Sequence, residues 1–424
     1  MIITIFKLLL KSVYKDIFMN IEKDGLIVTA EKAGDVVFSG ASKVEINADK
    51  IELSGFQFTG GDIGKDDIIS ITGSDVLITQ INIKDYTSYK YLIVDKESRR
   101  TTISYCNFEN RINRADQNIL SILVDDEPGY HKIQYCSFKN FSGTGGDMGV
   151  EPIRIGVSTQ AHLDSRTIVE YCYFENCDGD SEIISNKAAQ NVIRYNTFID
   201  NKKGELVLRH GDEAIVYGNF FLNNKGGIRI REGQNHFIYN NYFSGLTGRA
   251  INLQNDPSDP LDSIHFYFNT VVDSKEILLG GNGDHPPQHV VFANNIFAKP
   301  KDVLFDDPTG NEKWMGNIYW GKPGIDTVYG LKNLDPCLME NSHGYFQLNK
   351  KSPAIDAAIS GFPAIPQIEG LDFDDLELDI MKQTRPDAIP QQDIGASEFP
   401  NTVNVQPHAT QFNTGPAYID HETK

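Results

Sequence analysis

Three cationic side chains recur at equal intervals in the middle of the chain. Lys187, Arg209 and Arg231 follow one another at intervals of 22 residues, and a tyrosine stands eight residues after each of them. A fixed period of this length is typical of a solenoid, in which each repeat is one coil stacked on the next. Residues one period apart then lie about 4.8 Å apart, the spacing of hydrogen-bonded strands. The sequence therefore predicts a column of cations on one face.

Such a column can supply a base. A like charge on the next coil favours the neutral amine form of Lys187, because a second positive charge beside Arg209 is unfavourable. A neutral amine accepts a proton, so Lys187 is a candidate general base.

Two carboxylates stand just before this lysine, in the segment GDSEIISNK. Asp180 and Glu182 are two residues apart, so a strand places both on one face, where they repel unless a cation lies between them. Hard oxygen ligands at this spacing suit calcium, and Glu151 in GVEPIRIG is a candidate third ligand from an earlier coil. The alternative is that these carboxylates are solvated strand residues.

Further basic side chains occur near the column, namely Arg154, His210, Arg229 and His236. Each alone is compatible with an ordinary surface position. The chain as a whole carries a formal net charge of −19, which disfavours a general affinity for nucleic acid or for an anionic membrane. A local group of cations in so acidic a protein predicts a groove for carboxylates or sulfates.

The periodicity also predicts the fold class, which is all-β, a single right-handed parallel β-helix (solenoid) with an N-terminal cap and a C-terminal extension. Cys106, Cys136 and Cys172 each follow a tyrosine and should form an inward stack. Asn196, Gly218 and Asn240 share the position after the later tyrosines, where asparagine side chains can bond from coil to coil. Longer intervals predict inserted loops near 110–130 and 140–165, which would wall the groove.

Four segments are expected. Residues 1–24 form an N-terminal segment or cap, either a poor export signal or a capping helix; residues 25–298 form the repeats with the groove; residues 299–399 form terminal coils, a cap and an extension; residues 400–424 form a polar tail. The apolar N-terminus is interrupted by lysines, so no membrane span is expected. We expect a monomer.

Several motifs together resemble one family. EIISNKAAQN, LRHG, GGIRI and NHFIYNNYF, with EPIRIG upstream and DIGASE near the end, are similar to polysaccharide lyase family 6, the alginate lyases and chondroitinase B, over most of residues 25–399. The resemblance implies a parallel β-helix with Lys187 as catalytic base and Arg209 as catalytic arginine. It implies that Asp180 and Glu182 are calcium ligands, with Glu151 as the positional match for the third; the family more usually has two glutamates at the first two positions.

The resemblance also implies the reaction. A lyase of this family cleaves a uronic-acid polymer, here most simply alginate, by calcium-assisted β-elimination to 4,5-unsaturated products. The side chains that would hold neighbouring sugars are Arg154, His210, Arg229, Arg231 and His236. Secretion or a periplasmic location is expected. Three alternatives stay open: a chondroitin or dermatan sulfate lyase, a glycoside hydrolase using Asp180 and Glu182, and a non-catalytic carbohydrate-binding β-helix.

Overall fold

The structure is a computed structural model that describes residues 4–8, 11–112, 117–143, 149–254, 261–281, 285–326, 328–374 and 376–419. The chain divides into two compact units, and each is described by itself. Unit 1 consists of Met1–Asn191, Asn201–Gly204 and Ala409–Lys424, and unit 2 consists of Val192–Asp200 and Glu205–His408. No helix in the described residues is long and apolar enough to cross a membrane.

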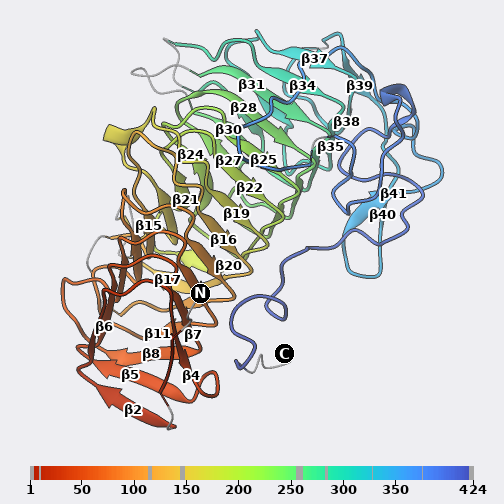
Figure 1. Cartoon of the computed structure of the whole chain (residues 1–424). Helices are drawn as coiled ribbons and strands as arrows, with labels where there is room; N and C mark the ends of the chain where they lie inside the picture. Colours follow the sequence, from red (N-terminus) through yellow and green to blue (C-terminus); the bar gives the residue numbers. More distant parts are fainter. Residues whose placement is uncertain are drawn as a thin grey trace. The chain divides into compact units, whose positions relative to one another are not determined.

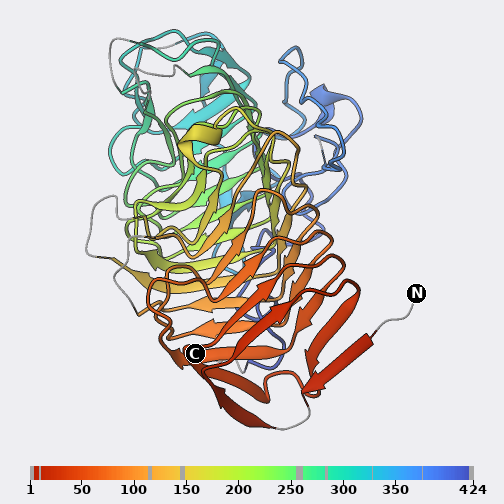
Figure 2. The same ribbon diagram turned by 60° about the vertical axis from the view of Figure 1, so that its left-hand side comes forward.

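Unit 1 is a stack of coils, each built from three short strands that pair in parallel with the same strands of the next coil (Figure 1). Figure 2 shows these red to yellow coils from another side. The first sheet contains β1 (Thr4–Leu8), β4 (Leu26–Ala30), β7 (Glu52–Ser54), β10 (Leu77–Thr79), β13 (Thr102–Ser104), β16 (Lys132–Gln134) and β19 (Ile168–Glu170). The second contains β2 (Ser12–Lys15), β5 (Val36–Gly40), β8 (Phe56–Gly61), β11 (Asn82–Lys84), β14 (Asn107–Glu109), β17 (Ser137–Ser142) and β20 (Tyr173–Asp178). The third contains β3 (Phe18–Ile21), β6 (Lys43–Ile46), β9 (Ile69–Ile71), β12 (Leu92–Val94), β15 (Leu120–Ile122), β18 (Ile153–Ile155) and β21 (Glu182–Asn186), and a short 3-10 helix, η1 (Ser158–Gln160), follows β18.

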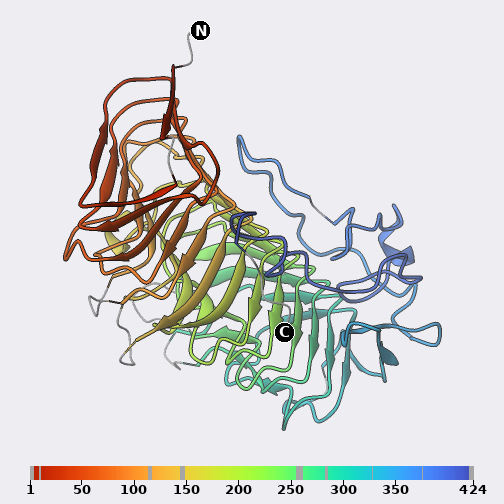
Figure 3. The same ribbon diagram turned by 90° about the horizontal axis from the view of Figure 1, so that it is seen from below.

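Unit 2 repeats this arrangement, and its green to cyan coils are seen stacked in Figure 3. Its first sheet contains β22 (Val192–Arg194), β25 (Ile215–Tyr217), β28 (Gln234–Tyr239), β31 (Asp262–Tyr267), β34 (Val291–Ala293) and β37 (Lys313–Met315). Its second contains β23 (Thr197–Ile199), β26 (Phe220–Leu222), β29 (Tyr242–Ser244), β32 (Thr270–Val272), β35 (Ile296–Ala298), β38 (Asn317–Trp320) and β39 (Leu331–Asn333). Its third contains β24 (Glu205–Leu208), β27 (Ile228–Ile230), β30 (Ile251–Leu253), β33 (Ile277–Leu279) and β36 (Phe305–Asp306). The hairpin β40 (Leu338–Glu340) and β41 (Phe346–Leu348) and the 3-10 helix η2 (Ile389–Gln391) belong to the C-terminal extension.

These parallel coils confirm the predicted fold class, an all-β right-handed parallel β-helix. Strands of two to six residues alternate inward and outward side chains, so apolar residues of successive coils meet in the interior. Phenylalanines stack there from coil to coil: in unit 2, Phe198, Phe221 and Phe243 have ring centroids 4.8 Å apart at both steps. The interior is therefore filled by columns of like residues.

A sharp turn separates the first and second strands of each coil. Tyr195 (φ 57°), Gly218 (φ 66°) and Asn240 (φ 51°) hold equivalent places in this turn with left-handed backbone, a conformation most accessible to glycine and asparagine. The residue after it points inward. In unit 1 this inward residue is Cys106, Cys136 or Cys172, each without exposed surface, which confirms the predicted cysteine stack.

In unit 2 the same inward position carries an asparagine ladder. The rungs are Asn196, Asn219, Asn241, Asn269, Asn295 and Asn317, and each amide donates to the next side-chain oxygen over 2.8–3.0 Å. The prediction that Gly218 and Asn240 share the position of Asn196 is wrong by one residue. Val192 pairs with Ile215, one residue beyond the 22-residue interval, so Asn196 lies beside Asn219.

The structure also changes the expected boundaries. The N-terminal segment forms no helix in its described residues; β1, β2 and β3 pair with β4, β5 and β6, so the coils begin before residue 25. Within residues 299–399, where terminal coils are expected, the coils run to β38 and β39. Parts of the predicted loops, residues 113–116 and 144–148, lie outside the described residues.

The predicted polar tail is packed against the coils as far as it is described. Its residues 409–419 belong to unit 1, where the Tyr418 hydroxyl donates to the carbonyl oxygens of Phe56 and Gln80 and the Ala417 N–H donates to the Gln80 side chain. This dark blue segment lies beside the early coils (Figures 1 and 3). The last residues, 420–424, lie outside the described part.

Candidate active site

Lys187 immediately follows β21, the last strand of the third sheet in unit 1. Its N–H donates to the Ile155 carbonyl oxygen at 2.8 Å, and its side chain is 9 % exposed. The register Arg154↔Ser185 and Ile155↔Asn186 fixes how this strand lies on β18. The backbone ladder therefore holds the lysine at the end of a strand with little solvent around it.

Asp180 stabilises the bend that leads into β21. One carboxylate oxygen accepts the Glu182 N–H at 3.0 Å and the Ser181 hydroxyl at 3.2 Å, and the other accepts the Gly149 N–H at 2.6 Å. Asp180 is 2 % exposed and Glu182 is 1 % exposed. Both carboxylates are thus buried at the entry to β21, the strand that precedes Lys187, and the interpretation of them as solvated residues is wrong.

Glu151 and Arg154 form an ion pair on the preceding coil. The Arg154 Nη2 donates to both Glu151 oxygens, at 2.5 and 2.7 Å, and Nε donates to one of them at 3.1 Å. Burial raises the pKa of Glu151, Arg154 opposes this effect, and the nearby charge of Asp180 adds to it. If the β18–β21 register is extended by two residues, Glu151 lies beside Glu182.

These residues do not fit a calcium ion in the arrangement described. Protein donors engage both oxygens of Glu151 and of Asp180. Within the described ranges, no group of three or more His, Cys, Asp or Glu side chains is placed to hold a metal ion. Calcium binding by Asp180, Glu182 and Glu151 stays a prediction, and it requires that Arg154 release Glu151.

In unit 2, Arg209 and Arg231 each immediately follow a strand of the third sheet. The pairs Leu206↔Ile228 and Leu208↔Ile230 place Arg209 and Arg231 side by side on adjacent coils, and the Arg231 N–H donates to the Leu208 carbonyl oxygen at 3.0 Å. This confirms the part of the predicted cationic column that lies in unit 2. Lys187 belongs to unit 1, so its approach to Arg209 stays a prediction.

His210 and Arg229, which lie near these arginines in the sequence, pair with two glutamates that were not predicted from the sequence. The His210 Nδ1 lies in ion-pair contact with Glu232, a residue 3 % exposed on the next coil. The Arg229 Nε lies 3.1 Å from a Glu205 oxygen. Both glutamates stand about one 22-residue period from their partners, the signal that could have revealed them.

His236 is buried, contrary to the prediction that it holds a neighbouring sugar unit. Its side chain has no exposed surface, because His236 begins the buried part of β28. Its Nδ1 accepts the Ala214 N–H at 3.1 Å, and burial lowers its pKa to about 3. A neutral, enclosed imidazole positions the turn and does not contact a ligand in this arrangement.

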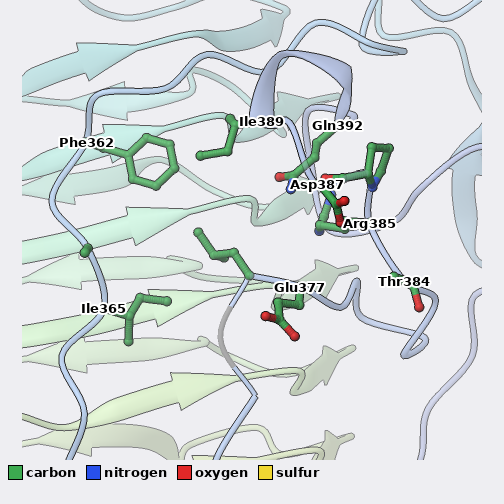
Figure 4. A pocket seen from close by; sticks show the side chains of 11 residues that line it. Phe362, Ile365, Glu377, Thr384, Arg385, Asp387, Ile389 and Gln392 are labelled. Carbon is green, nitrogen blue, oxygen red and sulfur yellow. Dashed lines mark hydrogen bonds between the residues drawn. The ribbon is translucent and has the colours of Figure 1, made fainter.

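A cleft of about 580 Å³ lies in the C-terminal extension of unit 2 (Figure 4). Phe362, Ile365 and Ile389 line it together with Arg385. Arg385 is 2 % exposed and donates to Asn240, to Glu398 and to the carbonyl oxygens of Asp393 and Gly395. Its charge anchors the extension to the coils, so this cleft offers none of the chemistry of the cationic column.

Stacked parallel coils with lysine, arginine and carboxylate side chains at the strand ends place the chain in the class of parallel β-helix proteins. Within that class, the family profile described as Chondroitinase B matches residues 7–279. The chain belongs to the chondroitinase B family. No curated protein matches the chain significantly.

Solved structures agree with this assignment. The fold is similar to that of the PL6 family alginate lyase AlyGC, with a TM-score of 0.73 and 23% identity over 82% of this chain and 52% of that chain. It is also similar to a mannuronic acid specific polysaccharide family 6 lyase from human gut microbiota, with a TM-score of 0.62 and 23% identity over 78% of this chain and 85% of that chain. A third similar structure is the PL6 family polysaccharide lyase Pedsa3628 from Pseudopedobacter saltans, with a TM-score of 0.64 and 21% identity over 79% of this chain and 93% of that chain. The chain spans about half the length of AlyGC. At these identities the likeness establishes the fold.

Proposed function

We propose that this protein is a polysaccharide lyase that cleaves alginate by β-elimination. The observation that carries the proposal is that Lys187, Arg209 and Arg231 each occupy the position directly after a strand of the third sheet, at β21, β24 and β27. In a β-helix this position recurs once per coil. The family assignment and the alginate lyases of similar fold support a polyuronate as substrate.

The chemistry follows from the side chains. The neutral amine of Lys187 takes the proton from C5 of a uronate, the electron pair of that C–H bond forms the C4–C5 double bond, and the bond from C4 to the bridging oxygen breaks. The positive charge of Arg209 stabilises the negative charge that develops on the C5 carboxylate. The departing oxygen takes a proton from His210 or Arg209, which lie at the same strand end. The products are one unsaturated and one saturated chain end.

The test is incubation with alginate. The wild-type protein should produce material that absorbs in the ultraviolet because of the new C4–C5 double bond, and Lys187→Ala should abolish that signal while the circular dichroism spectrum stays unchanged. Chain cleavage that yields only saturated ends would instead indicate a glycoside hydrolase. Binding of alginate oligosaccharides without any cleavage would indicate a carbohydrate-binding β-helix.

A second substrate deserves a parallel assay, because the matching family profile is described as Chondroitinase B. Dermatan sulfate, like alginate, carries a uronate whose C5 proton can be removed, and the arginines can pair with sulfate as well as with carboxylate. Unsaturated product from dermatan sulfate and none from alginate would replace the proposed substrate and retain the proposed chemistry.

A further inference from the structure

A second cluster of cations lies in unit 2 beside the arginines already described. It lines a cleft of about 340 Å³ whose charged members are Lys225, Arg229, Arg249, Lys275, Glu205 and Glu276. Four positive charges against two negative ones give this cleft a formal charge of +2, in a chain whose formal charge is −19. The cleft therefore attracts anions against the background of the whole protein.

The two arginines of this cleft are held in place by ion pairs. The Arg229 Nε lies 3.1 Å from Glu205, and the Arg249 Nη2 lies 3.1 Å from Glu276. Lys225 and Lys275 are exposed, and neither has an acidic side chain within ion-pair distance among the residues that the structure describes. The two lysines are thus the cations of the cleft that remain available to a ligand.

The lysines repeat with the coils. Arg249 and Lys275 form a backbone bridge, so they lie on adjacent coils, and Lys225 lies one coil before Arg249 beside Gly248. Strand spacing separates successive coils by about 4.8 Å. A polymer that runs along the stack with one carboxylate on every sugar therefore meets cationic side chains on three successive coils.

Amide side chains complete the lining. Asn252 pairs in register with Arg229 on the next coil, and the Gln254 Oε1 accepts from the Arg229 Nη1 at 3.4 Å. Carboxamides bond readily to hydroxyl groups, and ammonium groups pair with carboxylates. In a polysaccharide, the sugar unit that carries both a carboxylate and hydroxyl groups is a uronic acid.

The cleft is continuous with the proposed catalytic face. Arg229 stands two residues before Arg231, so both side chains leave the same face of the third sheet, about 7 Å apart along the strand. We propose that this cleft is a remote subsite for polyuronate chains, in which Lys225 and Lys275 bind carboxylates away from the cleavage point and retain long polymers. This inference depends on the proposed function for its substrate class.

The test compares Lys225→Gln/Lys275→Gln with Lys332→Gln/Lys350→Gln, which removes two exposed lysines elsewhere in unit 2. KM for long alginate chains should rise roughly 5- to 10-fold in the cleft variant, because the two lost exposed ion pairs together weaken binding by about 1–1.4 kcal/mol. The kcat should stay unchanged, the control variant should match wild type, and the difference should shrink in high salt.

Chain length separates a remote subsite from a direct role in catalysis. The cleft variant should match wild type on the shortest alginate oligosaccharides that are cleaved and lose affinity as the substrate lengthens. An equal loss at every length, or no loss at any length, would overturn the inference. Retention of the protein on immobilised alginate gives a second measurement that does not depend on cleavage. If the wild-type protein has no lyase activity but is retained more strongly than the cleft variant, the proposed function is refuted and the binding cleft is not.

Discussion

At the scale of single residues, Glu232 determines how His210 can act. Its carboxylate contacts the His210 Nδ1 from the adjacent coil, and only 3 % of its surface is exposed. A carboxylate in this position fixes the orientation of the ring and its tautomer. Glu232 is therefore a positioning residue for the proposed proton transfer.

Glu232→Gln should lower kcat by about 10- to 100-fold, the range found when a group that orients a functional histidine is removed. KM should change little, because Glu232 is buried behind the histidine. The measurement is the initial rate of ultraviolet absorbance on alginate, with Glu340→Gln, an exposed glutamate of the same unit, as the control. A kcat equal to that of wild type would show that Glu232 is not required to orient the His210 imidazole.

Calcium dependence is decided by the carboxylates near Lys187. If Asp180 and Glu182 hold a calcium ion that neutralises substrate charge, a chelator should abolish activity and added calcium should restore it. Asp180→Asn should then raise the calcium concentration needed for half-maximal activity by about 10-fold or more, since it removes a charged ligand. Full activity in the chelator, with a normal unfolding temperature, would leave Asp180 with its structural role at the bend before β21.

At the scale of elements, the asparagine ladder defines the turns of unit 2. The Asn241 oxygen accepts the Asn219 backbone and side-chain N–H groups, and its amide donates to the carbonyl oxygens of Val216 and Tyr239 and to Asn269. All of these groups are buried, so each needs its partner. One side chain thus satisfies buried groups on several coils.

Asn241→Ala should destabilise unit 2 by about 3 kcal/mol, because it leaves several buried donors and acceptors without partners. Urea unfolding followed by circular dichroism measures this difference. Asn333→Ala, at an exposed position on β39, should change stability by less than about 0.5 kcal/mol. Equal effects of the two substitutions would mean that the ladder contributes nothing beyond an exposed asparagine.

The coils could be predicted from the sequence, whereas the exact strand register and one local ion pair could not. The coils could be predicted because the same residue types return at the same turn, as Cys106 and Cys136 do. The ladder was misplaced by one residue because the step from Val192 to Ile215 differs from the tyrosine spacing, and only strand pairing reveals that step. The ion pair of Glu151 with Arg154 was missed because it forms across a bend, where periodicity carries no information.

At the scale of the whole molecule, buried histidines connect stability to pH. Burial lowers the pKa of His236 from 6.5 to about 3. Below pH 6.5 the unfolded chain binds a proton at this residue while the folded chain does not, so its contribution to stability is lost as the pH falls from 6.5 toward 3. The slope is at most about 1.4 kcal/mol per pH unit for one such group.

His236→Asn should reduce this acid sensitivity, because the asparagine oxygen can accept the Ala214 N–H without titrating. The free energy of unfolding, measured in urea at several pH values between 7.5 and 4, should fall less steeply in the variant than in wild type. His343→Asn, at an exposed position, should retain the wild-type slope. Identical slopes for all three proteins would show that His236 is protonated equally in both states.

Unit 1 is assembled from both ends of the chain, since residues 409–419 lie on coils that contain Phe56 and Gln80. During synthesis these coils emerge more than 300 residues before Tyr418, the side chain that covers them. The nascent coils therefore keep that patch exposed until Tyr418 has been translated. A chain that stops before residue 409 would retain every early coil and lack the segment that covers them.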